Sequence, residues 1–271
     1  MTASLRARGL VVGCACLAVA AGCGSTGQDV VTFPLSVAGT GTTTFQSGAW
    51  DVTLERADVG FGPIWFCATP FADIGVCDQA GAEWLGTTTL DALDDGARKV
   101  GEANAVTGTV RSAIFDYGRS WLLTGTAPRP DDGSPGGHSA RFVARATDGT
   151  RTLEVHADID VDPAHAGQTA VIAAPTGTHT ITGAEALTVR FDPVAWWKRV
   201  DFDALAALDD DDDGVVELTP PAGGTPSGAD AGVPTTLDGG TGGHVAPSSD
   251  AYTTLSIRMT TRPPTFEWAQ R

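Results

Sequence analysis

Four acids and one histidine alternate with apolar residues over residues 153–162, a spacing that a strand would place on one face. The polar row is Glu154, His156, Asp158, Asp160 and Asp162, and the apolar row is Leu153, Val155, Ala157, Ile159 and Val161. Alternate residues of a strand point to the same side, about 6.5–7 Å apart. Carboxylates at that spacing could hold a cation or supply the acid and base of a hydrolase. The same pattern is also typical of a plain strand with one face in the core and one in water.

Five consecutive aspartates, Asp209 to Asp213, are followed by Gly214. Aspartates at the first, third and fifth positions with glycine at the sixth resemble the first part of the calcium loop of EF-hand and dockerin proteins. The resemblance implies calcium ligands from Asp209, Asp211, Asp213, the carbonyl of Val215 and Glu217. Calcium takes six to eight oxygens, but the twelfth position, where the motif has a bidentate acid, is Pro220. A further ligand must then come from elsewhere, and the run is also typical of a solvated linker.

The seven tryptophans suggest a carbohydrate site, because sugars stack on flat aromatic faces. We expect Trp50 and Trp65 instead to fill the core, and Trp196 or Trp197 to seat a helix on the sheet. The five histidines lack the spacing H-E-x-x-H, and the chain has no G-x-S-x-G, Walker A or G-x-G-x-x-G element. Zinc protease, serine hydrolase and nucleotide-enzyme chemistry is therefore not indicated.

The elements that would position these residues are mostly strands. Glycine and proline occur at short intervals among abundant valine and threonine, which favours an all-β domain. One strand is expected to begin at Val30, and one over Val59–Phe66 is expected to bend at Gly62-Pro63. Further strands are expected over Trp50–Glu55 and at 106–115, 119–126, 139–147, 151–162 and 185–191. Asp148-Gly149 predicts a hairpin turn, and Arg129–Gly137 an exposed loop.

The last third of the chain mixes element types. One helix is predicted at 193–208, with Asp192 as N-cap and Pro193 in the first turn. A short strand is expected at Val215–Leu218, and the Gly- and Pro-rich residues 220–249 should form a flexible insertion. A final strand is expected from the alternation of Thr253, Leu255, Ile257 and Met259.

The N-terminal segment has the organisation of a secretion signal, with Arg6 and Arg8 before the apolar run Leu10–Ala21. Residues 17–24, Leu-Ala-Val-Ala-Ala-Gly-Cys-Gly, resemble the bacterial lipobox, in which small residues precede an obligatory cysteine. The resemblance implies removal of residues 1–22, acylation of Cys23 and a tether at 23–29. Because Gly24 rather than aspartate follows, it also implies the outer membrane of a Gram-negative host. The alternative is an ordinary signal cleaved near Gly22.

Only two cysteines, Cys67 and Cys77, would remain unmodified after this processing. Two cysteines in an exported protein most often pair, and no histidine lies beside them to suggest a metal site. We therefore expect a disulfide between Cys67 and Cys77.

The chain is acidic, with 33 Asp and Glu against 17 Lys and Arg and a formal net charge of −16. This charge argues against nucleic acid as a partner and against electrostatic binding to anionic lipids.

We expect one antiparallel β-sandwich-like domain over 30–271, anchored to the membrane by its lipid. Its expected role is that of a non-enzymatic binding or structural module with a protein or glycan partner and calcium as its one candidate cofactor. The alternatives are an envelope hydrolase built on Glu154, Asp158 or Asp160, and a carbohydrate-binding protein.

Overall fold

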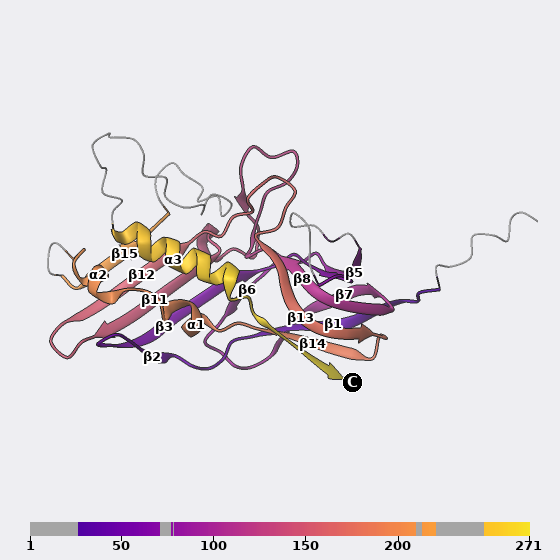
Figure 1. Cartoon of the computed structure of the whole chain (residues 1–271), viewed down its shortest axis with the longest axis horizontal. Coiled ribbons are helices and arrows are strands. Elements are labelled where there is room, and N and C mark those ends of the chain that lie inside the picture. The colour runs from indigo at the N-terminus through magenta and orange to yellow at the C-terminus, as the bar shows by residue number, and fades with distance from the viewer. Residues whose placement is uncertain (1–26, 71–76, 78, 210–212, 221–246) are drawn as a thin grey trace, which may run out of the picture.

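A computed structural model describes residues 27–70, 77, 79–209, 213–220 and 247–271 of the chain. Two large β-sheets, accompanied by one two-stranded sheet, follow one another along the long axis of the molecule (Figure 1). Neighbouring strands are antiparallel except for two parallel pairs, β1 with β14 and β12 with β15. The predicted all-β, sandwich-like fold is confirmed.

The first sheet has eight strands. In spatial order they are β13 (Val171–Ile181), β8 (Gly108–Phe115), β4 (Ile64–Cys67), β5 (Ala80–Trp84), β7 (Arg98–Val106), β1 (Val30–Ala38), β14 (Glu185–Arg190) and β16 (Thr265–Gln270). The sheet curls so that its two outermost strands meet, and the rings of His179 in β13 and Trp268 in β16 stack at 4.1 Å. Phe33, Phe66 and Leu187 fill the space enclosed by this curl.

The second sheet has six strands. They are β15 (Val215–Leu218), β12 (Thr152–Ile159), β11 (Ala140–Thr147), β3 (Trp50–Phe61) and β2 (Thr44–Ser47), with β6 (Thr88–Asp91) paired to the far end of β3. Trp50, Val52 and Leu54 are buried, as the alternation predicts. The predicted turn at Asp148-Gly149 joins β11 to β12, and Asp148 accepts backbone hydrogen bonds from Thr150 and Arg151.

The chain passes from one sheet to the other at Gly62-Pro63. β3 ends at Phe61 and β4 begins at Ile64, on either side of a cis peptide bond. The predicted interruption of this strand is confirmed. A side chain at position 62 would meet the carbonyl of Gly86 at 2.3 Å, and Gly62 has φ +98°, so only glycine fits.

The predicted helix at 193–208 is wrong as a single element. It is two short helices, α1 (Pro193–Trp197) and α2 (Phe202–Ala206). Asp192 caps α1 as predicted, but Asp201 accepts hydrogen bonds from the amides of Asp203 and Ala204 and so starts a second helix. Trp196 and Trp197 are fully buried, and both contact Phe142 of β11, as expected for residues that seat the helix.

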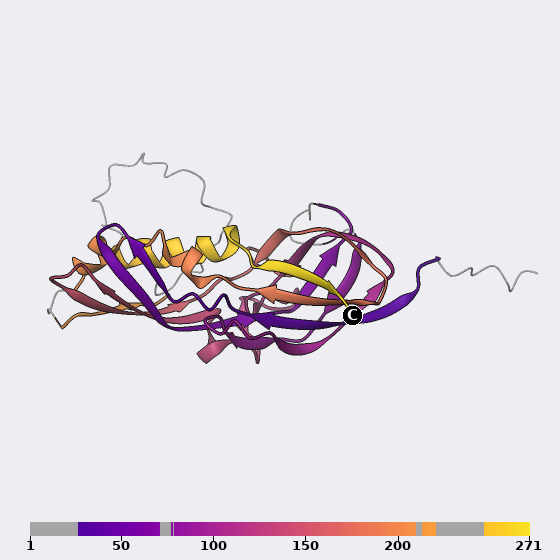
Figure 2. The ribbon, with the colours of Figure 1, turned by 90° about the horizontal axis from the view of Figure 1, so that it is seen from below.

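The predicted last strand is a helix, α3 (Pro247–Thr261). Its buried residues are Ala251, Tyr252, Leu255 and Met259, which recur at helical spacing, whereas Ile257 is exposed. α3 lies over the second sheet and contacts β12, β15, α1 and α2 (Figure 2). The last strand is instead β16, beyond Pro263-Pro264. α3 begins inside the predicted flexible insertion, of which residues 221–246 lie outside the described residues.

Other predicted strands agree with the structure to within a few residues, with one exception that shapes the surface. The strand expected at 119–126 is only β9 (Arg119–Ser120), which pairs with β10 (Arg129–Pro130). The loop expected at Arg129–Gly137 is partly packed, because it contains a 3-10 turn, η1 (Pro135–Gly137), with Pro135 buried. Strands β5, β6, β7, β13 and β16 were not predicted from the sequence, and neither was the two-residue strand β10.

Candidate functional site

A cleft of about 850 Å³ lies on the outer face of the eight-stranded sheet. Its floor includes Trp65 of β4 and Ile114 of β8, which are paired across the two strands. Ile64 and Phe66 on either side of Trp65 are fully buried in the core, so Trp65 points to the opposite face. The prediction that Trp65 fills the core is therefore wrong. Its half-buried ring borders the cleft instead.

One wall of the cleft is the tip of the β9–β10 hairpin. Trp121, Leu122 and Leu123 follow β9 directly and border the cleft. The amide of Gly167 donates to the carbonyl of Trp121 at 2.6 Å, which joins this tip to the loop after β12. Gly167 has φ +81°, a conformation that residues with a side chain rarely adopt, so the backbone where the two loops meet favours glycine.

The cleft exposes large apolar side chains to solvent. Of the seven large hydrophobic side chains that are exposed in the described part of the chain, three line this cleft: Leu85, Leu122 and Leu123. Leu123 is 82% exposed. Such side chains are ordinary when scattered singly, but gathered around a concavity they mark a surface that binds something.

A buried acid lies among the residues that line the cleft. Asp116 is only 2% exposed, and its Oδ1 accepts a hydrogen bond from the amide of Ala170 at 2.7 Å. Burial raises its pKa well above the ordinary value, and the nearby charges of Asp131 and Asp162 raise it further. Asp116 therefore keeps its proton to higher pH than an exposed aspartate does.

The base of the same hairpin and the turn after it carry further charged groups. Asp131 and Asp132 follow β10, and Arg129 lies within it. Asp131 is half-buried and accepts a hydrogen bond from the hydroxyl of Ser120 at 3.0 Å. Partial burial raises the pKa of Asp131 despite that hydrogen bond. Asp132 and Arg129 are exposed.

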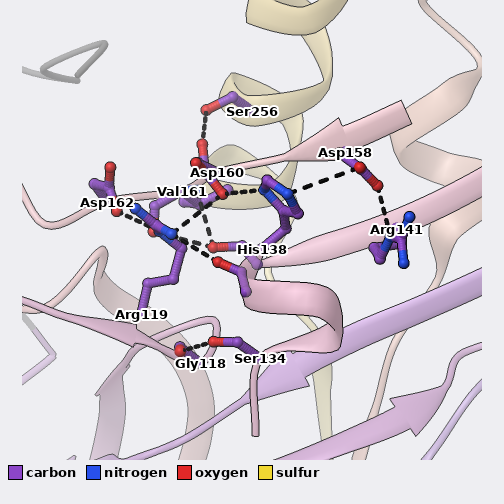
Figure 3. Close-up of polar contacts among 12 residues, drawn as sticks. Gly118, Arg119, Ser134, His138, Arg141, Asp158, Asp160, Val161, Asp162 and Ser256 are labelled. Atoms are coloured by element: carbon purple, nitrogen blue, oxygen red, sulfur yellow. Dashed lines mark hydrogen bonds and ion pairs between the residues drawn. The ribbon is translucent and has the colours of Figure 1, made fainter. Parts of the chain in front are cut away.

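Arg119 anchors the β9–β10 hairpin to the segment that follows β12 (Figure 3). Its Nε lies 2.7 Å from Asp162 and its Nη1 3.5 Å from Asp160, and Nη1 also donates to the carbonyl of Gly137 at 2.8 Å. The Arg119 and Asp162 side chains are 12% and 5% exposed. The last two acids of the polar row, which follow the end of β12, thus hold the hairpin that forms the wall of the cleft.

The rest of this row is paired as well, and none of it lines the cleft. Asp158 lies 2.7 Å from Arg141, and His138 lies 3.0 Å from Asp160 and 3.7 Å from Asp158 (Figure 3). Farther along, Glu154 and Glu217 flank His156 at 2.7 and 3.3 Å. The apolar row Leu153 to Val161 is buried, as expected. The polar row is therefore a paired, partly buried face and is not gathered around a cavity.

The predicted calcium loop is only partly described. Asp209 Oδ2 accepts a hydrogen bond from the amide of Gly214 at 3.1 Å, and Asp213 Oδ1 accepts one from the amide of Val215 at 2.8 Å. Asp211 lies outside the described residues. Among the residues that are described, no three His, Cys, Asp or Glu side chains are grouped to hold a metal ion. Calcium binding stays a prediction.

The expected disulfide between Cys67 and Cys77 is confirmed, with the two Cα atoms 5.3 Å apart. It lies next to the candidate site, because Cys77 borders the cleft. The third predicted cysteine, Cys23, lies outside the described residues, so its acylation also stays a prediction. No helix in the described parts of the chain is long and apolar enough to cross a membrane.

Comparison with known proteins identifies no relative: no protein-family model, no curated protein and no solved structure matches this chain.

Sequence reasoning missed the cleft because its residues come from separate segments. Trp65, Asp116 and Trp121 are placed together only when β4, β8 and the β9–β10 hairpin are in position. One local signal was present: Trp121-Leu122-Leu123 is an apolar triplet followed by Thr, Gly and Pro residues that end the strand. Consecutive apolar residues in a turn-rich segment can form a contiguous exposed patch, which is the kind of surface that binds a ligand.

Proposed function

We propose that this protein is a lipid-anchored envelope protein that binds a small amphipathic ligand in the cleft without transforming it. The observation that carries the proposal is the gathering of three exposed leucines around a concavity of ligand size. A volume of about 850 Å³ falls within the range of small-molecule sites. The floor is part of a sheet and the walls are tied by hydrogen bonds, so the site is formed before the ligand arrives.

The anchor fits the position of the cleft. β1 begins at Val30, at the end of the molecule opposite to α2 and β15 (Figures 1 and 2). An acylated Cys23 would precede Val30 by seven residues, which span at most roughly 25 Å. The eight-stranded sheet with its cleft would then be the membrane-proximal half of the protein, where an amphipathic ligand is available.

A hydrolase built on Glu154, Asp158 or Asp160 has less support. A catalytic acid or base needs access to the substrate and freedom to exchange a proton. Glu154 and Asp158 have cationic or imidazole partners within 2.7 Å, and Asp160 is bound by both His138 and Arg119. None of the three borders the cleft. We therefore favour binding over catalysis.

A carbohydrate ligand is the second candidate. Trp65 and Trp121 both line the cleft, together with the hydrogen-bonding side chains of Asp131, Asp132 and Arg129. Flat rings beside carboxylates could stack on a sugar ring and bind its hydroxyls. The exposed leucines favour an apolar ligand instead, because aliphatic side chains offer sugars no hydrogen bonds.

The test is binding of the neutral fluorophore N-phenylnaphthylamine, whose emission rises in apolar sites. The full chain would carry Cys23→Ser, so that no detergent competes with the probe. Saturable binding is expected, and Leu123→Ser should weaken it about fivefold through lost apolar contact. The matched control is Ile257→Ser, which removes an exposed aliphatic side chain from α3. Absence of saturable binding, or equal loss in both variants, would contradict the proposal, and displacement by maltotriose would favour the carbohydrate.

A further inference from the structure

The cleft is acidic as well as apolar. Its lining includes three carboxyl groups, on Asp116, Asp131 and Asp132, and one guanidinium group, on Arg129. The other arginine of the hairpin, Arg119, is bound to Asp160 and Asp162 behind the wall. Across the described residues, no ion pair involves any of the three cleft carboxyls. Asp116 is buried and its raised pKa favours the neutral form, so the charged carboxylates of the cleft are Asp131 and Asp132. Arg129, which acts on Asp131, balances one of them, and one negative charge remains in excess.

The backbone holds two of these carboxylates in place. The amide of Asp131 donates to the carbonyl of Gly118 at 2.8 Å, and the carbonyl of Asp131 accepts from the amide of Ser134 at 3.0 Å. Gly133, between them, donates to the hydroxyl of Thr87 at 3.2 Å, and its carbonyl accepts from the hydroxyl of Thr89 at 2.8 Å. This turn is thus fixed to both the hairpin and β6. Little ordering is needed for Asp131 and Asp132 to meet a charged ligand group.

The apolar and acidic parts of the cleft come from different segments. The leucines belong to the hairpin tip and to the segment after β5, whereas Asp131 and Asp132 belong to the turn after β10. Trp65 and Trp121 add aromatic faces, which attract cations as well as apolar groups. A ligand that satisfies all of these surfaces has an apolar body and a positively charged end.

We infer that the ligand is a cationic amphiphile: an alkyl or aryl body for the leucines and tryptophans, and a protonated amine or quaternary ammonium group for Asp131 and Asp132. This inference rests on the proposed binding function and adds the charge of the ligand. A fatty acid or another anionic amphiphile would bring its head group toward the carboxylates of Asp131 and Asp132 with only the exposed Arg129 to attract it.

The experiment compares three probes that share one chain and differ in head group: octylamine, octanol and octanoate. Each displaces N-phenylnaphthylamine from the full Cys23→Ser chain at neutral pH, where the amine is protonated and the acid ionised. Octylamine should displace the fluorophore at about one tenth of the concentration that octanol needs, since hydrogen bonds to charged groups are strong. Octanoate should be the weakest of the three.

The double variant Asp131→Asn with Asp132→Asn should abolish the advantage of octylamine over octanol. Its control is Asp94→Asn with Asp95→Asn, which changes the net charge equally at an exposed turn between β6 and β7 and should leave the advantage intact. Retained octanol binding shows that the cleft variant is folded. If the double variant no longer binds octanol, the single variant Asp132→Asn, which changes only the exposed aspartate, is tested in its place.

Equal displacement by the three probes, or tighter binding of octanoate, would overturn the inference while leaving the binding function in place. An advantage of octylamine that survives in the cleft variant would also overturn it. Failure of all three probes to displace the fluorophore would instead count against the proposed function itself.

Discussion

Arg119 and Asp162 form the ion pair that ties the wall of the cleft to the loop after β12. Nε of Arg119 lies 2.7 Å from Oδ1 of Asp162, and their side chains are only 12% and 5% exposed. Ser120 and Trp121, the next two residues after Arg119, border the cleft. The acidic row that suggested a catalytic pair thus continues beyond β12, where Asp162 positions the hairpin that forms the wall of the cleft.

The first prediction concerns this pair. Asp162→Ala leaves a buried guanidinium group with weaker partners, so we expect a loss of about 3 kcal/mol in the free energy of unfolding. The affinity for N-phenylnaphthylamine should fall in the same variant, because the hairpin loses its anchor. Urea unfolding and fluorescence titration measure the two effects.

The control for Asp162→Ala is Glu267→Ala, which removes the partner of Arg190 in another pair, 2.8 Å apart. That pair is more exposed, so its loss should cost less than about 1 kcal/mol and leave the cleft unchanged. Equal effects of the two variants on stability and on affinity would contradict the role assigned to Arg119 and Asp162.

The second prediction concerns the buried acid. The pKa of Asp116 is raised in the folded protein, so the folded state retains the proton to higher pH than the unfolded chain does. Asp116 contributes its full stabilisation at pH values below its pKa in the unfolded chain. That contribution is lost as pH rises through its pKa in the folded protein. Asp116→Asn keeps an acceptor for the amide of Ala170 and removes this titration.

Urea unfolding between about pH 4 and pH 8 should therefore show the wild-type protein losing stability relative to Asp116→Asn as pH rises. Asp94→Asn, at an exposed position, should show no such difference. A constant difference between wild type and Asp116→Asn across the range would refute the raised pKa.

The sequence predicts the strands with clear alternation well, because burial of one face leaves its mark on every second residue. Trp50, Val52 and Leu54, and the apolar row of β12, are examples. The alternation of apolar residues gives the wrong element at α3, because Leu255 and Met259 are four residues apart and fit one face of a helix equally well. The alternation of Thr253, Leu255, Ile257 and Met259 favoured the strand, and packing against β12 and β15 decides for the helix.

The candidate site could be predicted far less well than the fold. The disulfide followed from counting cysteines, but its position beside a cleft did not. Trp65 has the same sequence environment as a core residue, and only the pairing of β4 with β5 and β8 shows which face it occupies. Distances between loops depend on tertiary packing that no local pattern encodes.

The third prediction tests the anchor. In cells that produce the protein with its own N-terminal segment, Cys23→Ser should move it from the membrane pellet to the soluble fraction, because acyl chains supply the membrane affinity. Cys14→Ser, a change within the expected signal, should leave it in the pellet. Membrane association that is the same in both variants, with no acyl mass on the peptide that begins at Cys23, would refute lipidation.

The fourth prediction tests calcium. The loop from Asp209 to Glu217 can offer about five oxygens, fewer than Ca²⁺ prefers, so affinity should be in the range of roughly 10⁻⁴–10⁻³ M. About 5 mM calcium should then stabilise the folded protein by about 1–2 kcal/mol. Asp211→Ala with Asp213→Ala should remove this gain, and Asp94→Ala with Asp95→Ala should keep it. A melting curve that calcium does not change would identify the run as a solvated linker.

The central claim is that the cleft between Trp65 and the hairpin tip binds the ligand, and indole N–H signals in a nitrogen-15 NMR spectrum test it most directly. The indole groups of Trp50 and Trp196 donate to Asp203 and to the carbonyl of Arg262, away from the cleft. Trp65→Phe and Trp121→Phe variants assign the two cleft signals. Titration with octylamine should shift the Trp65 and Trp121 signals and leave those of Trp50 and Trp196 in place. Unmoved Trp65 and Trp121 signals, or equal shifts of all four, would contradict the account.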